Sequence, residues 1–201
     1  MRSADLAREY LAAMRAITPA DIGELVDAGV DPADACWHAG VTRIAHMADT
    51  GLYEPDDETG GLAFITPVRV DDDVTPESPD PEICVRRGAI VDLVAWDPRT
   101  PREWALRTGL ADWLGCAGPQ FLDPKPVRVW RSILAWFRAG CRGLVPLSRD
   151  SAATYRLITG LHGGIIVEDE EHAEELRDII ERPRPLPEII VAPSEAALAT
   201  G

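Results

Sequence analysis

Residues 142–191, RGLVPLSRDSAATYRLITGLHGGIIVEDEEHAEELRDIIERPRPLPEIIV, decide the predicted fold because short apolar runs alternate there with helical patterns. Three runs have the length of short strands, and they are Gly143–Leu147, Gly164–Val167 and Glu188–Val191. The segments between them, 149–159 and 169–181, carry apolar residues at helical spacing. This alternation predicts a βαβαβ unit with a small parallel sheet and right-handed crossovers.

The first fifty residues are predicted to be helical. Ser3, Thr18-Pro19 and Asp31-Pro32 are helix-start signals, because a polar N-cap or a proline at the first position suits a helix N-terminus. Residues 41–49 are expected to add one or two turns. The fragment HAGVTRIAHM (38–47) also permits a helix-turn-helix interpretation, although Arg43 alone would give its recognition helix positive charge. The alternative is a helical cap on the sheet.

The middle of the chain reads as strands followed by two helices. Leu62–Val70 is a predicted strand, in which Pro67 favours an edge position. Residues 83–96 predict a hairpin that turns near Arg87-Gly88, with Ala89–Trp96 as its second arm. One helix is expected to begin at Pro101 and end near Gly115, and another to run from Pro126 to Ala139.

These elements predict an α+β or α/β class, with an N-terminal helical unit packed on a small mixed sheet that ends in the βαβαβ segment. The expected parts are a helical unit at 1–53, a strand flanked by acidic, proline-rich loops at 54–82, an α/β core at 83–192 and a flexible tail at 193–201. A chain of 201 residues fits one compact domain.

Charge is distributed unevenly along the chain. Residues 99–156 contain ten Arg or Lys and four acids, whereas the remainder contains ten bases and thirty acids, for a net charge of −14. Five arginines are the anion-binding candidates, namely Arg128, Arg131, Arg138, Arg142 and Arg149. The first three share one arc of the predicted helix, where Trp136 could stack on a base. The alternative is that the acidic flanks neutralise these arginines within the fold.

A second candidate site lies at the ends of the predicted parallel strands. Ligands of such sheets bind beyond the carboxyl ends of the strands, where this chain places Asp150, Glu168, Asp169 and His172. The carboxylates could hold a divalent cation, His172 could act as a base, and Arg149 could contact an anionic group. The alternative is structural, since Asp150 and Asp169 suit helix N-caps.

The sequence also sets limits on the function. The four cysteines have no zinc-ligand spacing, and His38 and His46 are too far apart around a helix to pair, so no metal ligand is predicted. No apolar run is long enough for a membrane span. One Lys against nineteen Arg, with no Asn, indicates a GC-rich bacterial genome, and the absence of a signal sequence favours the cytoplasm.

Two functions remain open from the sequence. The first is a bacterial cytoplasmic accessory protein whose Arg- and Trp-rich helical surface contacts a protein, with nucleic acid as another anionic partner and no membrane. The second is a metal- or phosphate-dependent enzyme with its site at the strand ends. A divalent cation would be its cofactor.

Overall fold

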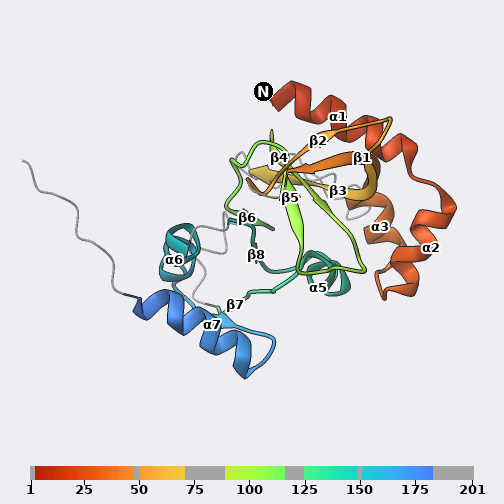
Figure 1. Cartoon of the computed structure of the whole chain (residues 1–201). Coiled ribbons are helices and arrows are strands. Elements are labelled where there is room, and N and C mark those ends of the chain that lie inside the picture. Colours follow the sequence, from red (N-terminus) through yellow and green to blue (C-terminus); the bar gives the residue numbers. More distant parts are fainter. Residues whose placement is uncertain (1–2, 48–49, 71–88, 116–124, 149–150, 183–201) are drawn as a thin grey trace, which may run out of the picture.

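A computed structural model describes residues 3–47, 50–70, 89–115, 125–148 and 151–182. Helices and strands are mixed in this part of the chain, which confirms the α+β class. Figure 1 shows the N-terminal helices beside a group of strands, with α6 (Ser151–Thr159) and α7 (Glu170–Glu181) lying away from those helices.

Three helices begin the chain, as the start signals predict. They are α1 (Ser3–Ala16), α2 (Pro19–Asp27) and α3 (Pro32–His38). A capping box starts α2, because Thr18 Oγ1 accepts the Asp21 backbone N–H while the Asp21 carboxylate accepts the Thr18 backbone N–H. Asp31 caps α3 by accepting the Ala33 backbone N–H at 2.8 Å.

The prediction of further helix at 41–49 is wrong, because Gly40–Met47 form strand β1. Val41, Thr42 and Ile44 are β-branched, and such side chains pack better on a pleated strand than on a helix. The N-terminal unit at 1–53 is therefore only partly helical, and the helix-turn-helix interpretation loses its recognition helix.

Five strands form a closed barrel in the order β1, β2, β5, β4, β3. The strands that join β1 are β2 (Leu52–Pro55), β3 (Gly61–Val70), β4 (Ala89–Trp96) and β5 (Trp104–Leu106). Neighbours are antiparallel except β2 and β5, which pair in parallel through Leu52 and Leu106. β4 confirms the predicted arm Ala89–Trp96, whereas the predicted turn near Arg87-Gly88 lies outside the described residues.

Pro67 lies where β3 has a single described neighbour. Pairing with β1 extends to Ile65, while Pro67 itself lies opposite Leu93 of β4. A proline cannot donate to a second ladder, so its position is compatible with a strand that lies between two others over most of its length. The register shifts directly afterwards, between Val68 and Arg69.

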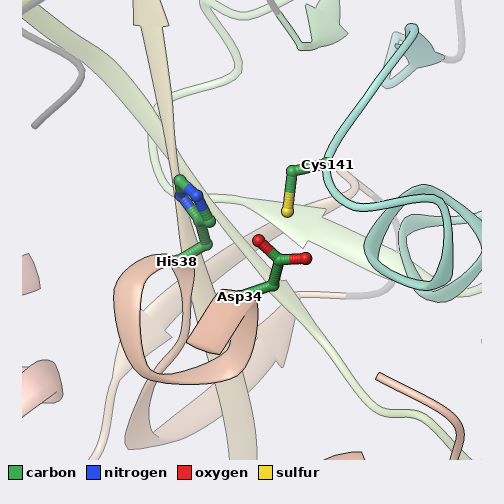
Figure 2. A group of neighbouring side chains, drawn as sticks. All are labelled: Asp34, His38 and Cys141. Carbon is green, nitrogen blue, oxygen red and sulfur yellow. The ribbon is translucent and has the colours of Figure 1, made fainter. Parts of the chain in front are cut away.

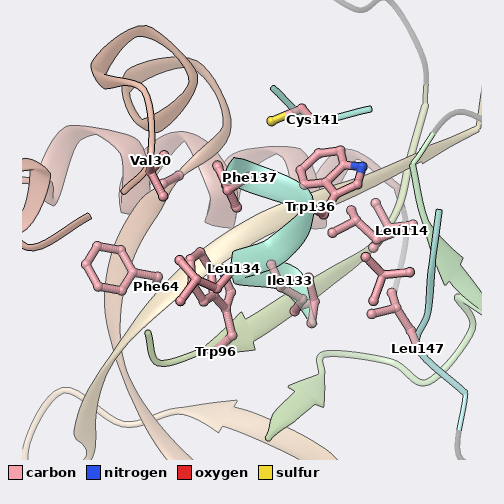
Figure 3. Packing of buried hydrophobic residues seen from close by; sticks show 14 of the residues in the cluster. Val30, Phe64, Trp96, Leu114, Ile133, Leu134, Trp136, Phe137, Cys141 and Leu147 are labelled. Carbon is pink, nitrogen blue, oxygen red and sulfur yellow. The ribbon is translucent and has the colours of Figure 1, made fainter. Parts of the chain in front are cut away.

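Two clusters of buried side chains lie on the strands. Successive residues of β4 alternate between them, since Leu93 and Ala95 pack with α1 while Val94 and Trp96 pack in the other cluster. Helix α5 (Ile133–Arg138) supplies the centre of that second cluster, through Ile133, Leu134, Trp136 and Phe137. Figure 3 shows these side chains facing Phe64 and Trp96 of the strands and Val30 of the N-terminal region.

The C-terminal half contains short strands in a partly parallel arrangement. They are β6 (Trp113–Leu114), β7 (Val127–Arg128), β8 (Val145–Pro146) and β9 (Ile165–Ile166). β7 pairs in parallel with β9, and a parallel bridge joins Val129 to Leu144. β8 pairs antiparallel with β6. The predicted strands at 143–147 and 164–167 therefore do not pair with each other; each lies parallel to the segment 127–129 instead, which was predicted to be helical.

The two predicted middle helices are corrected. The segment from Pro101 to Gly115 holds β5 and β6, and the segment from Pro126 to Ala139 is helical only in α5. Ser132 sets the start of α5, because its Oγ accepts the Ala135 backbone N–H at 3.1 Å. Helices α6 and α7 confirm the predicted helices at 149–159 and 169–181, while the strand expected at 188–191 lies outside the described residues.

In the segments that the structure describes, every helix is too short or too polar to cross a lipid bilayer.

Candidate functional site

A cleft of about 280 Å³ lies where β7, β8 and β9 end. Trp130 and Arg131 follow β7, Ser148 follows β8, and His172 lies in the first turn of α7 after β9. Arg102, Trp104, Thr154 and Glu175 complete the polar and aromatic part of its lining. The structure thus gathers side chains at the carboxyl edge of the parallel strands, where open α/β sheets bind ligands.

Arg131 is the centre of this edge, with a side chain that is 9% exposed. Its Nη2 lies 2.5 Å from Asp169 Oδ1 and its Nη1 2.9 Å from Glu171 Oε2. Its Nε lies 3.3 Å from Glu175 Oε2. Burial alone would lower the pKa of the guanidinium, but the surrounding carboxylates raise that pKa above its usual value. Arg131 is therefore neutralised by three acids of the α7 region.

Glu168, Asp169 and His172 are joined to the same network. Glu168 Oε2 accepts the Arg131 backbone N–H at 3.0 Å, and Asp169 Oδ1 accepts the His172 backbone N–H at 2.8 Å as the N-cap of α7. The His172 imidazole is buried, and its Nδ1 accepts the Glu168 backbone N–H at 3.4 Å. Burial lowers the pKa of His172, which favours the neutral ring with its proton on Nε2.

This arrangement positions helix α7 against β7. The Asp169 carboxylate already binds the Arg131 guanidinium and caps α7, and the Glu168 carboxylate already accepts the Arg131 backbone N–H, so a metal ion at this edge would have to displace these contacts. Asp150 and Arg149, the other candidates from the β8 side, lie outside the described residues.

A second hollow, of about 500 Å³, is also lined by Trp130 and is called the basic pocket here. Its lining residues are Lys125, Pro126, Val127, Arg128, Trp130, Ala139, Arg142 and Gly143. Three of these side chains are cationic and exposed, and none of the lining residues that the structure describes is an acid. Within the described residues, no carboxylate lies within ion-pair distance of Arg128 or Arg142.

Trp130 organises the basic pocket. The Arg128 guanidinium carbon lies 5.1 Å from the centroid of the indole ring, which is a cation–π contact. The indole Nε1–H donates to the Arg142 carbonyl at 2.7 Å. Gly143 must be glycine, because its φ is 89° and a Cβ there would lie 2.4 Å from the Arg128 carbonyl oxygen. Trp130 thus contacts the Arg128 side chain through its ring and the Arg142 backbone through its indole N–H.

The other predicted binding residues take different positions. Arg138 is exposed at the end of α5, its Nε donates to the Ala28 carbonyl at 2.6 Å, and it is not among the described lining residues of the basic pocket. Trp136 is buried, with 2% of its surface exposed, and its Nε1–H donates to the Gly143 carbonyl. The expectation that Trp136 stacks on a base is therefore wrong, because that ring belongs to the core.

Trp130 and Lys125 are functional candidates that the sequence analysis missed. Trp130 falls within the helix predicted from Pro126 to Ala139 and Lys125 lies directly before it, so the predicted helix does not place them in a common pocket. The available signal was the alternation of Val127, Arg128, Val129 and Trp130, in which alternate residues differ in polarity as in a strand.

Searches against protein-family models, curated proteins and solved structures find no match to this chain, so its own residues carry the functional interpretation.

Proposed function

We propose that the protein is a non-enzymatic interaction module that receives an anionic group of a partner in the basic pocket. The observation that carries the proposal is the pair Arg128 and Arg142 beside Trp130, exposed and without a carboxylate neighbour in the described structure. Arginine presents several N–H donors in a plane, which matches carboxylate and phosphate oxygens. A third cation, Lys125, lines the same hollow.

The partner that fits best is an acidic segment of another protein. The basic pocket holds three cations in one hollow, which suits one or two carboxylates. A nucleic acid would bring a continuous row of phosphates close to a chain of net charge −14, and most nucleic-acid modules are basic as a whole. Because the positive charge is confined to the pocket, it complements a short acidic stretch of a partner better than a long polyanion.

The setting that we propose is the bacterial cytoplasm. The two described cysteines, Cys36 and Cys141, are not disulfide-bonded, which suits a reducing compartment. The arginine-rich composition supports a bacterial source.

The enzymatic alternative has less support. A metal- or phosphate-dependent site at the strand ends would need Glu168 and Asp169 as ligands, yet both already bind Arg131. In the described structure, no observation at the carboxyl edge of the parallel strands favours a metal cation over Arg131 as the partner of these carboxylates.

Fluorescence anisotropy of a labelled, Glu-rich peptide tests the proposal. We expect wild-type protein to bind it, and the double variant Arg128→Ala/Arg142→Ala to bind at least about tenfold more weakly, or about 1.4 kcal/mol. Arg8→Ala/Arg15→Ala is the charge-matched control, because both arginines are exposed on α1 and neither lines the pocket, and it should bind as wild type does.

A single-stranded oligonucleotide of equal charge is the competing probe. Tighter binding of the oligonucleotide, with a salt dependence that indicates several phosphate contacts, would replace the acidic-protein partner with nucleic acid. Binding of neither probe, or equal binding by the double variant and wild type, would contradict the proposal.

A further inference from the structure

Three potential metal ligands meet between the N-terminal helices and the end of α5. Asp34 and His38 belong to α3, and Cys141 follows α5. One ligand atom from each, a carboxylate oxygen, an imidazole nitrogen and the thiol sulfur, lie within 4.8 Å of one another. Figure 2 shows the three side chains as neighbours, with Asp34 and His38 on the same helix and the Cys141 sulfur facing the Asp34 carboxylate.

The sequence places the first two ligands on one face of α3. Residues four apart in a helix lie one above the other, so Asp34 and His38 project in the same direction. Each could also complement the helix dipole, since Asp34 is in the first turn and His38 in the last. The dipole does not explain why a cysteine 103 positions beyond His38 joins them.

The backbone at Cys141, the third potential ligand, has an unfavourable conformation. Gly140 has a φ of 67°, as is common directly after a helix. Cys141 has a φ of 56° and is the one non-glycine residue with positive φ in the described structure. Such a conformation costs a β-carbon residue about 1–2 kcal/mol. Strain of this kind often accompanies a functional side chain, and here it accompanies a buried thiol beside a histidine and a carboxylate.

We propose that Asp34, His38 and Cys141 form a binding site for Zn²⁺ or a cation of similar softness. Zinc takes thiolate, imidazole and carboxylate ligands, and a set of three protein ligands leaves the fourth tetrahedral position to water. The thiolate and imidazole disfavour Mg²⁺ and Ca²⁺, which prefer oxygen. On binding, the Cys141 thiol releases its proton to solvent and the sulfur bonds to the metal as a thiolate.

The present geometry requires little movement to ligate zinc. With bond lengths of about 2.0–2.3 Å, tetrahedral ligand atoms lie about 3.3–3.8 Å apart, so separations of up to 4.8 Å need to close by ~1.5 Å at most. The His38 ring is already oriented by an edge contact with Trp136, at 6.1 Å between ring centroids. The metal would join α3 to the segment after α5 and so link the two halves of the chain.

Cobalt substitution of the whole chain tests this site. After the protein is stripped of metal, one equivalent of Co²⁺ should produce a thiolate-to-cobalt charge-transfer band and the intense visible bands of tetrahedral coordination, and one equivalent of Zn²⁺ should remove both. Cys141→Ser should abolish the charge-transfer band. Asp34→Asn and His38→Gln should each weaken zinc binding, measured by calorimetry, by more than ~100-fold. This is a larger loss of affinity than the replacement of a residue that only bonds to a metal ligand usually causes.

Cys36→Ser is the matched control, because Cys36 is an exposed cysteine on the same helix and outside the cluster. It should keep the cobalt spectrum and the affinity of wild type. Circular dichroism of every metal-free variant should show the wild-type fold. If Cys141→Ser unfolds, Asp34→Asn gives a second test of the site, because Asp34 is at a partly exposed position. A charge-transfer band that survives in Cys141→Ser, or that disappears in Cys36→Ser, would overturn the site, as would zinc binding unaffected by Asp34→Asn.

Discussion

Asp92 shows how much of this fold depends on a single polar side chain. It is fully buried, and its carboxylate accepts five backbone N–H groups at 2.8–3.2 Å. Four of those donors belong to residues 107–111, which connect β5 to β6. The carboxylate therefore replaces a regular ladder at the point where the chain leaves the barrel.

Asp92→Asn should lower the free energy of unfolding by about 3 kcal/mol, because an amide group cannot accept from the donors that face one of the two oxygens. Urea denaturation measures this change. Asp57→Asn, at an exposed position in a turn, is the control and should stay within about 0.5 kcal/mol of wild type. A midpoint for Asp92→Asn equal to that of the control would show that the carboxylate is not needed.

His172 gives the protein a defined dependence on pH. Burial lowers the pKa of His172 in the folded state, so an unfolded chain takes up a proton first as the pH falls below about 6.5. The stabilising contribution of neutral His172 is therefore present above this pH and is lost as the pH falls through the lowered pKa.

His172→Gln should make the fall in unfolding free energy between about pH 7 and pH 5 less steep. Chemical denaturation across this range measures the slope. His162→Gln, which replaces an exposed histidine, should keep the wild-type slope. A slope that is unchanged in His172→Gln would mean that His172 does not titrate differently on folding.

Residue-scale predictions from the sequence succeeded where the cause is local. Asp169 is an N-cap, as its position before a helical pattern indicates, because an N-cap bonds to the first helical turn. The role of Asp92 could not be predicted, since four of its five donors lie 15–19 residues away and meet it only after the barrel has formed.

At the scale of elements, α7 is held by charge as well as by apolar contact. Leu176 and Ile179 pack against Val129 and Ile158, while the carboxylates near its N-terminus surround Arg131. These acids are partly exposed, but the guanidinium they share is not.

Arg131→Gln should loosen α7 without unfolding the barrel, because it leaves three carboxylates close together without their cation. Hydrogen exchange measured by mass spectrometry should show faster exchange in α7 and little change in β3 and β4. Arg177→Gln, which breaks the exposed ion pair with Glu170 on the same helix, is the matched control. Equal exchange in both variants would contradict the role assigned to Arg131.

Helices could be predicted from the sequence more reliably than strands at this scale. α1, α2, α3, α6 and α7 have start signals and enough turns to show a period. β7 and β9 contain two residues each, and their pairing depends on residues 38 positions apart, which no pattern within either segment encodes. The helix predicted from Pro126 merged β7 with α5, because apolar residues continue through both.

At the scale of the whole molecule, the barrel closes between β2 and β5 through a single parallel pair, Leu52 and Leu106. No periodicity within either segment encodes this contact, so the closed barrel could not be predicted from the sequence. The uneven distribution of charge could be predicted from the sequence, but its consequence differs from one arginine to another. Arg131 is neutralised within the fold, whereas Arg128 and Arg142 remain available in the basic pocket.

The central claim is that the basic pocket binds an anionic partner, and an NMR titration of isotopically labelled protein with the Glu-rich peptide tests it most directly. The predicted result is a saturable shift of the Trp130 indole N–H and of the Arg128 and Arg142 Nε–H resonances. The indole of Trp37, which is exposed on α3, should not move. Shifts confined to other residues, or no saturable shift at Trp130, would contradict the claim.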